Sequence, residues 1–367
     1  MGIPVNKNLV WVGIFTFAVF LAGLFSPEWH EQFYGQWVFP SVRLSMNALS
    51  FAFPFPLFWF FIPAFTFWVL WRLLSIFRNS SLKLWNRGWQ SLLFLAKVIL
   101  IAICFFYWVW GFNYLRPSSV ERLNLNTTAV EKERVFELLE DWTGLIGLQR
   151  QRLSESGMRT EEDLFAHRVD YGILVDGLND FLGIHNYPSF QHMPLRHWIP
   201  HGILLRNGTA GMYFPFTGES TIDPGLHPLQ IPFTSAHEMG HGAGFTDEGF
   251  CNLLALLICI RAEDPFINYS GGLTFWRHIA RAARSLDGDR YREFIEESLP
   301  EEIREDLQSI YRHRDRYPDW FSGLQRRMYH TYLRAHGVSE GVASYSQMLM
   351  LAESYFELYG EGEQHFD

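Results

Sequence analysis

Cysteine is scarce in this chain, which holds only Cys104, Cys251 and Cys259 among its 367 residues. Three cysteines cannot build a disulfide framework, and Cys104 sits in an apolar run where no partner would reach it. Cys251 and Cys259 recur at a helical spacing, so we expect buried apolar thiols there rather than metal ligands. Cysteine usage leaves the redox compartment open.

Positive charge is also in deficit. Lysine and arginine number 30 against 39 acidic residues, a formal net charge of −9. No basic stripe interleaved with aromatic residues follows residue 114. Nucleic-acid binding needs such a footprint, so nucleic acid is excluded as a partner. Internal repeats and low-complexity runs are absent as well, which argues against a solenoid or a linker-rich chain.

Long apolar runs are abundant before residue 113. Three of them, Leu9–Phe25, Leu57–Leu74 and Ser91–Phe112, are about long enough to cross the roughly 30 Å hydrocarbon layer. No small-residue cleavage site follows the first run, so it is predicted to be a retained span rather than a signal peptide. Residues 1–113 are therefore predicted to form a three-span anchor in a lipid bilayer.

The basic residues of the connecting loops predict the orientation of this anchor. The loop between the second and third spans carries Arg72, Arg78, Lys83 and Arg87, whereas the loop between the first two offers only Arg43. Positive loops stay on the cytoplasmic side. We therefore expect a multi-pass protein of the cytoplasmic (inner) membrane, with the N-terminus inside and everything after residue 113 extracytoplasmic.

Residues 114–367 are predicted to form one domain, mostly helical with a small β-sheet. Two capping boxes, Thr128–Glu131 and Thr160–Asp163, open segments with apolar residues at helical spacing. Only the stretch from about 199 to 223 is predicted to form strands, because short apolar runs there are separated by glycines.

The chemistry is predicted to lie in the segment His237-Glu238-Met239-Gly240-His241, which fits the pattern H-E-x-x-H. On a helix, residues four apart share one face, so both imidazoles can point at a single metal ion. Zinc suits neutral imidazole ligands and lowers the pKa of a bound water to about 7. Glu238 would then take a proton from that water as the general base.

A two-histidine zinc site needs a third protein ligand, and two acidic residues are in range. Glu248 begins a buried-looking helix after a glycine turn and resembles the ligand of glutamate-type zincins. Asp247 instead completes H-E-x-x-H-x-x-G-x-x-D, which resembles the metzincin spacing with Asp in place of the last His. Glu248 is preferred, and Asp247 remains the alternative.

Several specific strings spread over nearly the whole chain resemble those of a known bacterial family. They are Trp110–Pro117, Gly211–Glu219, Pro232–His241, Asp264–Phe266, Tyr269–Gly271, Tyr332–Ala335 and Gly341–Tyr345. The family is a domain-of-unknown-function group of membrane proteins, number 3810 in its series, with a zincin-like motif. The resemblance implies a three-span anchor and a metallopeptidase domain, without a settled substrate. It also suggests Tyr345 and His330 as candidate oxyanion donors.

One departure from the family pattern bears on the third ligand. Family members read about Glu-Asp-Glu-Ala-Asn after the histidine motif. Here Glu248 matches the first Glu, while Phe250 and Asn252 stand where the last Glu and the Asn would be. If the family ligand is the last Glu, the loop is shifted in this chain or the site has lost a ligand.

The resulting prediction is a membrane-anchored zinc metallopeptidase, with Zn²⁺ held by His237, His241 and Glu248, and Glu238 as the catalytic residue. Its partners would be a peptide or protein substrate and the lipid bilayer; the oligomeric state is not predicted. Two alternatives stay open: a zinc amidohydrolase that acts on cell-wall peptide links, and a catalytically inactive zincin-like scaffold or assembly protein.

Overall fold

The computed structural model of the chain describes residues 7–53, 55–190, 192–198, 200–320 and 344–360. Within those residues the fold is mostly helical, with three apolar helices in the N-terminal part and one small three-stranded sheet. The predicted fold class is therefore confirmed.

The chain divides into two compact units. The N-terminal unit comprises Met1–Pro117 and Phe214–Glu219, and the C-terminal unit comprises Ser118–Tyr213 and Ser220–Asp367. The short segment 214–219 thus belongs to the unit formed by the first third of the chain, although it lies about a hundred residues further along the sequence. The pattern of hydrophobic residues in a local window cannot predict that segment 214–219 belongs to the N-terminal unit, because the contacts responsible are distant in sequence.

Three helices of the N-terminal unit are long and apolar enough to cross a membrane: α1 (Lys7–Phe25), α4 (Phe58–Arg78) and α5 (Leu84–Val109). They match the three predicted spans, but α5 begins seven residues before Ser91. Its first turn includes Arg87, which donates to the backbone carbonyls of Leu82 and Phe77. The Trp108 indole of α5 donates to Thr16 of α1 over 3.0 Å.

The segment between the first two spans corrects the sequence prediction, which treated it as a loop. It is helical from Pro27 to Phe51, through α2 (Pro27–His30), the π-helix η1 (Glu31–Val38) and α3 (Phe39–Phe51). Contacts within the unit hold it in place. His30 lies 3.0 Å from the carbonyl oxygen of Phe112, and Glu31 pairs with Arg116 after the last span. The 3-10 helix η2 covers Gly111–Leu115.

Buried polar contacts fix the segment 214–219 inside the N-terminal unit. The fully buried Glu219 carboxylate accepts hydrogen bonds from the backbone N–H groups of Leu57 and Phe58, at 2.9 and 3.2 Å. These two groups open α4, where unpaired backbone donors attract a carboxylate. Arg43 of α3, also fully buried, donates to the carbonyl of Gly218 over 2.7 Å.

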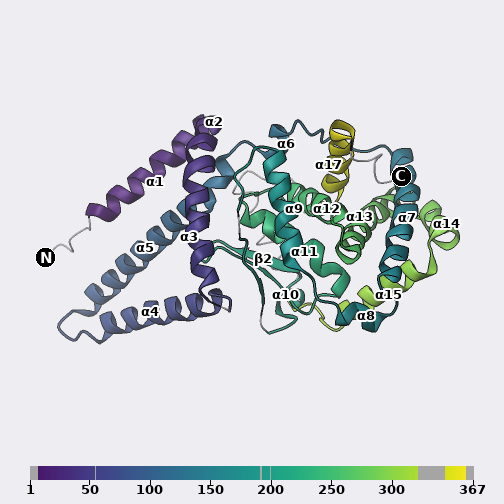
Figure 1. Ribbon diagram of the computed structural model, residues 1–367. Coiled ribbons are helices and arrows are strands. Elements are labelled where there is room, and N and C mark those ends of the chain that lie inside the picture. Colours follow the sequence, from purple (N-terminus) through teal and green to yellow (C-terminus); the bar gives the residue numbers. More distant parts are fainter. Residues whose placement is uncertain (1–6, 54, 191, 199, 321–343, 361–367) are drawn as a thin grey trace. The chain divides into compact units, whose positions relative to one another are not determined.

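The C-terminal unit is built around α12, which is buried along almost its whole length and packs against α9, α11, α13 and α17. A second layer is formed by α7, which runs along α13. Figure 1 labels most of these elements. Their bounds are α6 (Ser119–Arg122), α7 (Lys132–Glu155), α8 (Glu161–Ala166), α9 (Tyr171–Ile184), α10 (Ile203–Arg206), η3 (Pro228–Gln230), α11 (Ile231–Gly242), α12 (Glu248–Ile260), α13 (Pro265–Leu286), α14 (Gly288–Ser298), α15 (Glu301–Arg314) and α17 (Ser344–Tyr359).

The small sheet has the strand order β1-β3-β2, with β1 (Leu195–His197), β2 (Gly211–Phe214) and β3 (Glu219–Ile222). β1 and β3 are parallel, with Leu195 opposite Ser220. β2 and β3 fall within the stretch predicted to be strand, whereas β1 lies before it. Residues 203–206, which were included in that stretch, form the short helix α10 instead. The last strand, β3, ends at Ile222, and the chain then passes through the 3-10 helix at Pro228–Gln230 into the helix Ile231–Gly242, which carries the histidine motif.

A buried histidine makes the stability of the C-terminal unit depend on pH. Burial, and secondarily His313, lower the pKa of His227 to about 3, and its ring contacts the Ser309 hydroxyl and the Leu229 N–H. The unfolded chain binds this proton below about pH 6.5 and the folded chain does not. The contribution of His227 to the free energy of unfolding is therefore fully present above pH 6.5. It falls as the pH drops toward 3, by at most roughly 1.4 kcal/mol per pH unit.

Replacing His227 with Asn removes this titration while keeping an acceptor for the Leu229 N–H. We expect the apparent Tm of the full chain in detergent to fall less between pH 7 and pH 4 in the variant than in the wild type. Thermal unfolding at both pH values provides the measurement. An equal fall in the two proteins would contradict the assignment.

Candidate metal centre

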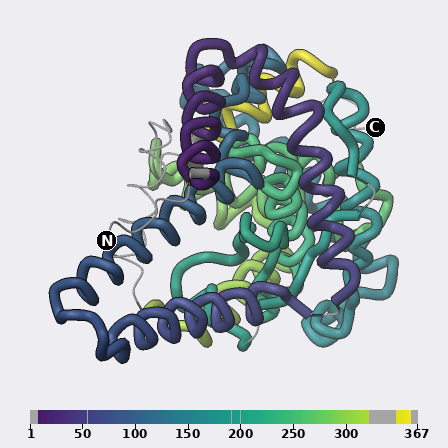
Figure 2. The backbone as a smooth tube through the Cα atoms, turned by 90° about the vertical axis from the view of Figure 1, so that its left-hand side faces the viewer, coloured from purple at the N-terminus to yellow at the C-terminus, as the bar shows by residue number. Residues whose placement is uncertain are grey.

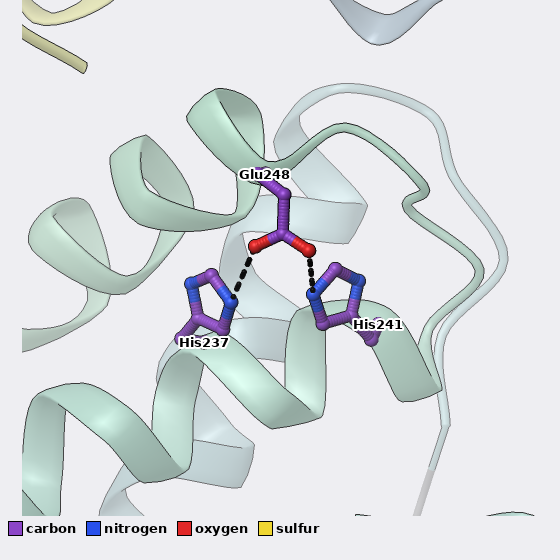
Figure 3. Close-up of side chains that lie close together, drawn as sticks. All are labelled: His237, His241 and Glu248. Atoms are coloured by element: carbon purple, nitrogen blue, oxygen red, sulfur yellow. Dashed lines mark ion pairs between the residues drawn. The ribbon is translucent and has the colours of Figure 1, made fainter. Parts of the chain in front are cut away.

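The two motif histidines lie on one face of α11, one turn apart. The helix begins at Ile231, with Pro232 in its first turn, where a missing N–H costs nothing. His237 and His241 have ring centroids 4.9 Å apart, and Figure 3 shows both imidazoles turned toward the same point. The spacing predicted from the sequence is therefore realised in the fold.

The third group comes from the first turn of α12. The Glu248 carboxylate lies between the two rings: one oxygen is 3.2 Å from His237 Nε2 and the other is 3.4 Å from His241 Nε2 (Figure 3). Asp247 is used differently. It is the N-cap of α12, and its carboxylate accepts from the Phe250 N–H at 2.6 Å. The fold thus brings Glu248, and not Asp247, to the histidine pair.

Two glycines allow the surrounding segments to approach this closely. A side chain at Gly240 would lie 3.1 Å from Leu254 and 3.3 Å from the Cys251 sulfur, so α11 and α12 touch at this point. A side chain at Gly249 would overlap Gln347 of α17, whose amide donates to Asp247 over 3.2 Å. Gln347 therefore packs over the turn that carries Glu248.

Backbone contacts orient the second imidazole. His241 Nδ1 lies 2.9 Å from the Phe245 carbonyl oxygen. A carbonyl only accepts, so Nδ1 carries a hydrogen, and Nε2 is the nitrogen that faces Glu248 and would bind a metal. Metal-binding histidines usually donate their other ring N–H in this way. The Cys251 thiol, 3.5 Å from the same Nδ1, packs beside the ring and completes its surroundings.

The three side chains form a group that could hold a metal ion. Their nearest donor atoms all lie within 4.8 Å of one another, and no other such group of His, Cys, Asp and Glu is found in the described residues. Two ligand atoms about 2.05 Å from one tetrahedral zinc would lie roughly 3.3 Å apart. The two separations between Glu248 and the histidines are close to this value.

Charge coupling in the cluster also favours a cation. Burial alone would raise the pKa of Glu248, but His241 and His237 outweigh it and hold that pKa well below its usual range. Burial alone would lower the pKa of His241, but Cys251 and Glu248 outweigh it and raise that pKa. A proton on His241 thus occupies the place where positive charge is stabilised, and a metal ion would displace it.

Glu238 lies beside the cluster without joining it. The side chain is 6% exposed, and its Oε2 atom makes no hydrogen bond to any described residue. Burial raises the pKa of its carboxyl, while His237 and His241 lower it only in part. An unpaired buried carboxylate oxygen is costly for a fold, and such atoms gather at functional sites.

Comparison with known families agrees with the resemblance found in the sequence. The family model described as "Protein of unknown function (DUF3810)" matches residues 34–352. The chain belongs to this family. Among curated proteins and among solved structures, the searches find no match. Membership in DUF3810 carries no activity, so the site is interpreted from its own geometry.

The departure of this DUF3810 chain from the family pattern has a structural counterpart. Phe250, which stands where the last Glu of the family string would be, is fully buried and contacts Phe245 and Phe181. Glu248 is the acidic residue of that string that reaches the histidines. The candidate oxyanion donors His330 and Tyr345 have side chains outside the described residues.

Two residues of the sheet that sequence reasoning missed contact the helix that carries the histidine motif. The Ser220 hydroxyl of β3 donates to the backbone carbonyl of Glu238 over 2.8 Å. A side chain at Gly211 of β2 would lie 2.6 Å from Glu238 Oε1 and 2.8 Å from the Thr221 carbonyl oxygen. The glycine-rich stretch before the histidine motif predicted strands, but it did not predict the contacts of these strands with Glu238.

Adding a methyl group at Gly211 is expected to displace the Glu238 side chain without removing any metal-binding group. For a hydrolytic metal site, the Gly211→Ala variant is expected to keep its metal but lose more than about tenfold in kcat, because misplacing a catalytic group by about 1 Å can cost 100-fold. The control is Gly144→Ala on α7, where a methyl group meets no atom within 4 Å. Equal kcat values for the two variants would contradict the prediction.

Proposed function

We propose that this chain is a membrane-anchored zinc metallopeptidase. The observation that carries the proposal is the buried Glu238 carboxyl, whose Oε2 atom has no hydrogen-bond partner among the described residues, beside two imidazoles and a carboxylate whose ligand atoms lie within 4.8 Å of one another. An open fourth position and a neighbouring base are what hydrolytic zinc sites require.

Each side chain has a distinct role in the proposed reaction. His237, His241 and Glu248 would hold the ion, and a bound zinc ion would acidify a water molecule and polarise the carbonyl group of a substrate. Glu238 accepts the proton of that water at Oε2 and returns it to the nitrogen of the departing amine. Burial raises the pKa of the Glu238 carboxyl, and a more basic carboxylate is a better acceptor for the proton of a water molecule.

The location of the site is part of the same proposal. The three apolar helices support membrane anchoring. The basic residues between the second and third spans, among them Arg72 and Arg78, favour a cytoplasmic loop there. With the N-terminus on the cytoplasmic side of the membrane, the C-terminal unit would act on peptides or proteins on the outer side.

The test combines metal content with a survey of substrates. The full chain, purified in detergent, is assayed for bound zinc by elemental analysis. It is then incubated with a mixture of unstructured peptides and, separately, with cell-wall stem peptides, and new termini are identified by mass spectrometry. We expect cleavage of ordinary peptides that a chelator stops and added zinc restores.

Three other outcomes would replace the proposal. Cleavage confined to the stem peptides would make the protein an amidohydrolase of cell-wall links. Stoichiometric zinc without any cleavage would favour a scaffold or assembly protein. A chain that binds no zinc would remove the basis of both hydrolytic functions.

A further inference from the structure

Helix α3 of the N-terminal unit has its polarity reversed relative to a helix that faces water. Its buried side holds Arg43, Asn47 and Ser50, which are at most 6% exposed. Its outer side exposes Leu44 (68%) and Phe51 (77%), together with Leu49. A surface helix in water buries its apolar stripe and exposes its polar one. The solvent that suits α3 is therefore apolar.

The buried polar side is occupied by contacts within the unit. Arg43 donates to the Gly218 carbonyl, and the Ser50 hydroxyl lies 3.4 Å from the Glu219 carboxylate. Arg43 is the only charged residue of α3, so the outer side carries no charge. The orientation of the helix is fixed by these polar contacts, which leaves its apolar side outward.

The hydroxyl groups on the outer side are also satisfied internally. Ser41 donates to the carbonyl of Trp37 over 2.8 Å, and Ser45 donates to the carbonyl of Ser41 over 2.9 Å. Serine hydroxyls bonded back to their own helix can enter an apolar layer without losing a partner. Trp37, two residues before α3 begins and 75% exposed, adds a ring of the kind found at membrane boundaries.

The connections of α3 to the neighbouring spans indicate how this helix is oriented relative to the bilayer. The helical segment Pro27–Phe51 joins the end of span α1 to the start of span α4. Figures 1 and 2 both show α3 crossing α4 steeply. If α4 crosses the membrane, α3 runs along the membrane plane.

We propose that α3 lies in the boundary layer of the bilayer, with its apolar side in contact with the lipids of the leaflet where α1 ends and α4 begins. The occupant is lipid rather than a partner protein, because the segment Pro27–Phe51 runs from the end of one candidate span, α1, to just before the start of the next, α4. An in-plane helix of this kind buries its apolar side about 5–10 Å into the headgroup and acyl boundary. The inference does not depend on the proposed hydrolase activity.

Spin labels on the full chain in lipid nanodiscs test this placement. One label is attached through Leu44→Cys, and the control label through Leu148→Cys, an exposed leucine (53%) on α7 of the C-terminal unit. The wild type controls for labelling of the native cysteines, since Cys104, Cys251 and Cys259 are buried and should not react. We expect the Leu44 label to collide several-fold more with oxygen, relative to a water-soluble nickel complex, than the control label does.

Labels at Trp37→Cys and Phe51→Cys complete the experiment by measuring depth along the segment. Similar shallow depths at Trp37, Leu44 and Phe51 support an in-plane helix. A depth that changes steadily along the three sites means that the segment crosses the bilayer, and overturns the proposal. Equal collision ratios at Leu44 and Leu148 would place α3 in water. Low access of both reagents to the Leu44 label would mean that protein covers it, and either result overturns the proposal.

Discussion

Replacing Glu238 with glutamine is expected to slow hydrolysis by about 10²- to 10⁴-fold and to leave the bound zinc in place. The amide has the size of the carboxyl group but cannot accept the proton of a water molecule. Glu238 is outside the group of three donors that lie within 4.8 Å of one another, so metal content should not change. The measurement is kcat with zinc analysis on the same preparation.

A matched variant separates the chemistry from a general loss of charge. Glu140 is an exposed residue of α7, and Glu140→Gln should retain wild-type kcat and zinc. Full activity in Glu238→Gln would remove the assigned base. Loss of zinc in that variant would instead mean that Glu238 helps to hold the ion.

Removal of the Glu248 carboxylate is expected to weaken zinc binding by more than about 100-fold, a larger effect than loss of an outer-shell partner. The reason is geometric, because the Glu248 carboxylate lies close to both imidazoles, at 3.2 and 3.4 Å. Glu248→Ala should lose zinc on dialysis, as His237→Ala should. Elemental analysis and competition with a zinc dye give the affinities.

The neighbouring Asp247 provides the control for this variant. Asparagine caps helices about as well as aspartate, so Asp247→Asn should keep the start of α12 and its zinc. Zinc that survives Glu248→Ala but is lost in Asp247→Asn would make Asp247 the third ligand. That result would restore the alternative with the metzincin-like spacing.

Local signals explain what the sequence could predict. The three spans follow from apolar length alone, and the pair His237 and His241 follows from helical spacing. The box Thr160–Asp163 was correct, since Thr160 caps α8 with both reciprocal bonds. The box from Thr128 was wrong: α7 starts at Lys132, and the Asn126 side chain accepts from Thr128 instead.

Contacts between distant residues explain what was missed. The helix α3 was read as a loop because its apolar and polar residues mix in a local window. The polar residues of α3 have a structural explanation only in the folded protein, where Arg43 and Ser50 contact Gly218 and Glu219, more than 160 residues away in sequence. The choice between Asp247 and Glu248 likewise needed the start of α12, because the residue that caps the helix is not the one that faces the histidines.

The segment 214–219 changes how this protein can be handled. Phe58 contacts Phe214 edge to face, and Phe61 and Phe105 stack against Phe216. A fragment that begins at Ser118 would expose both of these rings and leave the Glu219 carboxylate without its donors on Leu57 and Phe58. The next residue, Ser220, holds the backbone of Glu238. The N-terminal unit is thus a structural component of the protein rather than a detachable tether, and a trimmed water-soluble version is a poor substitute for the whole chain.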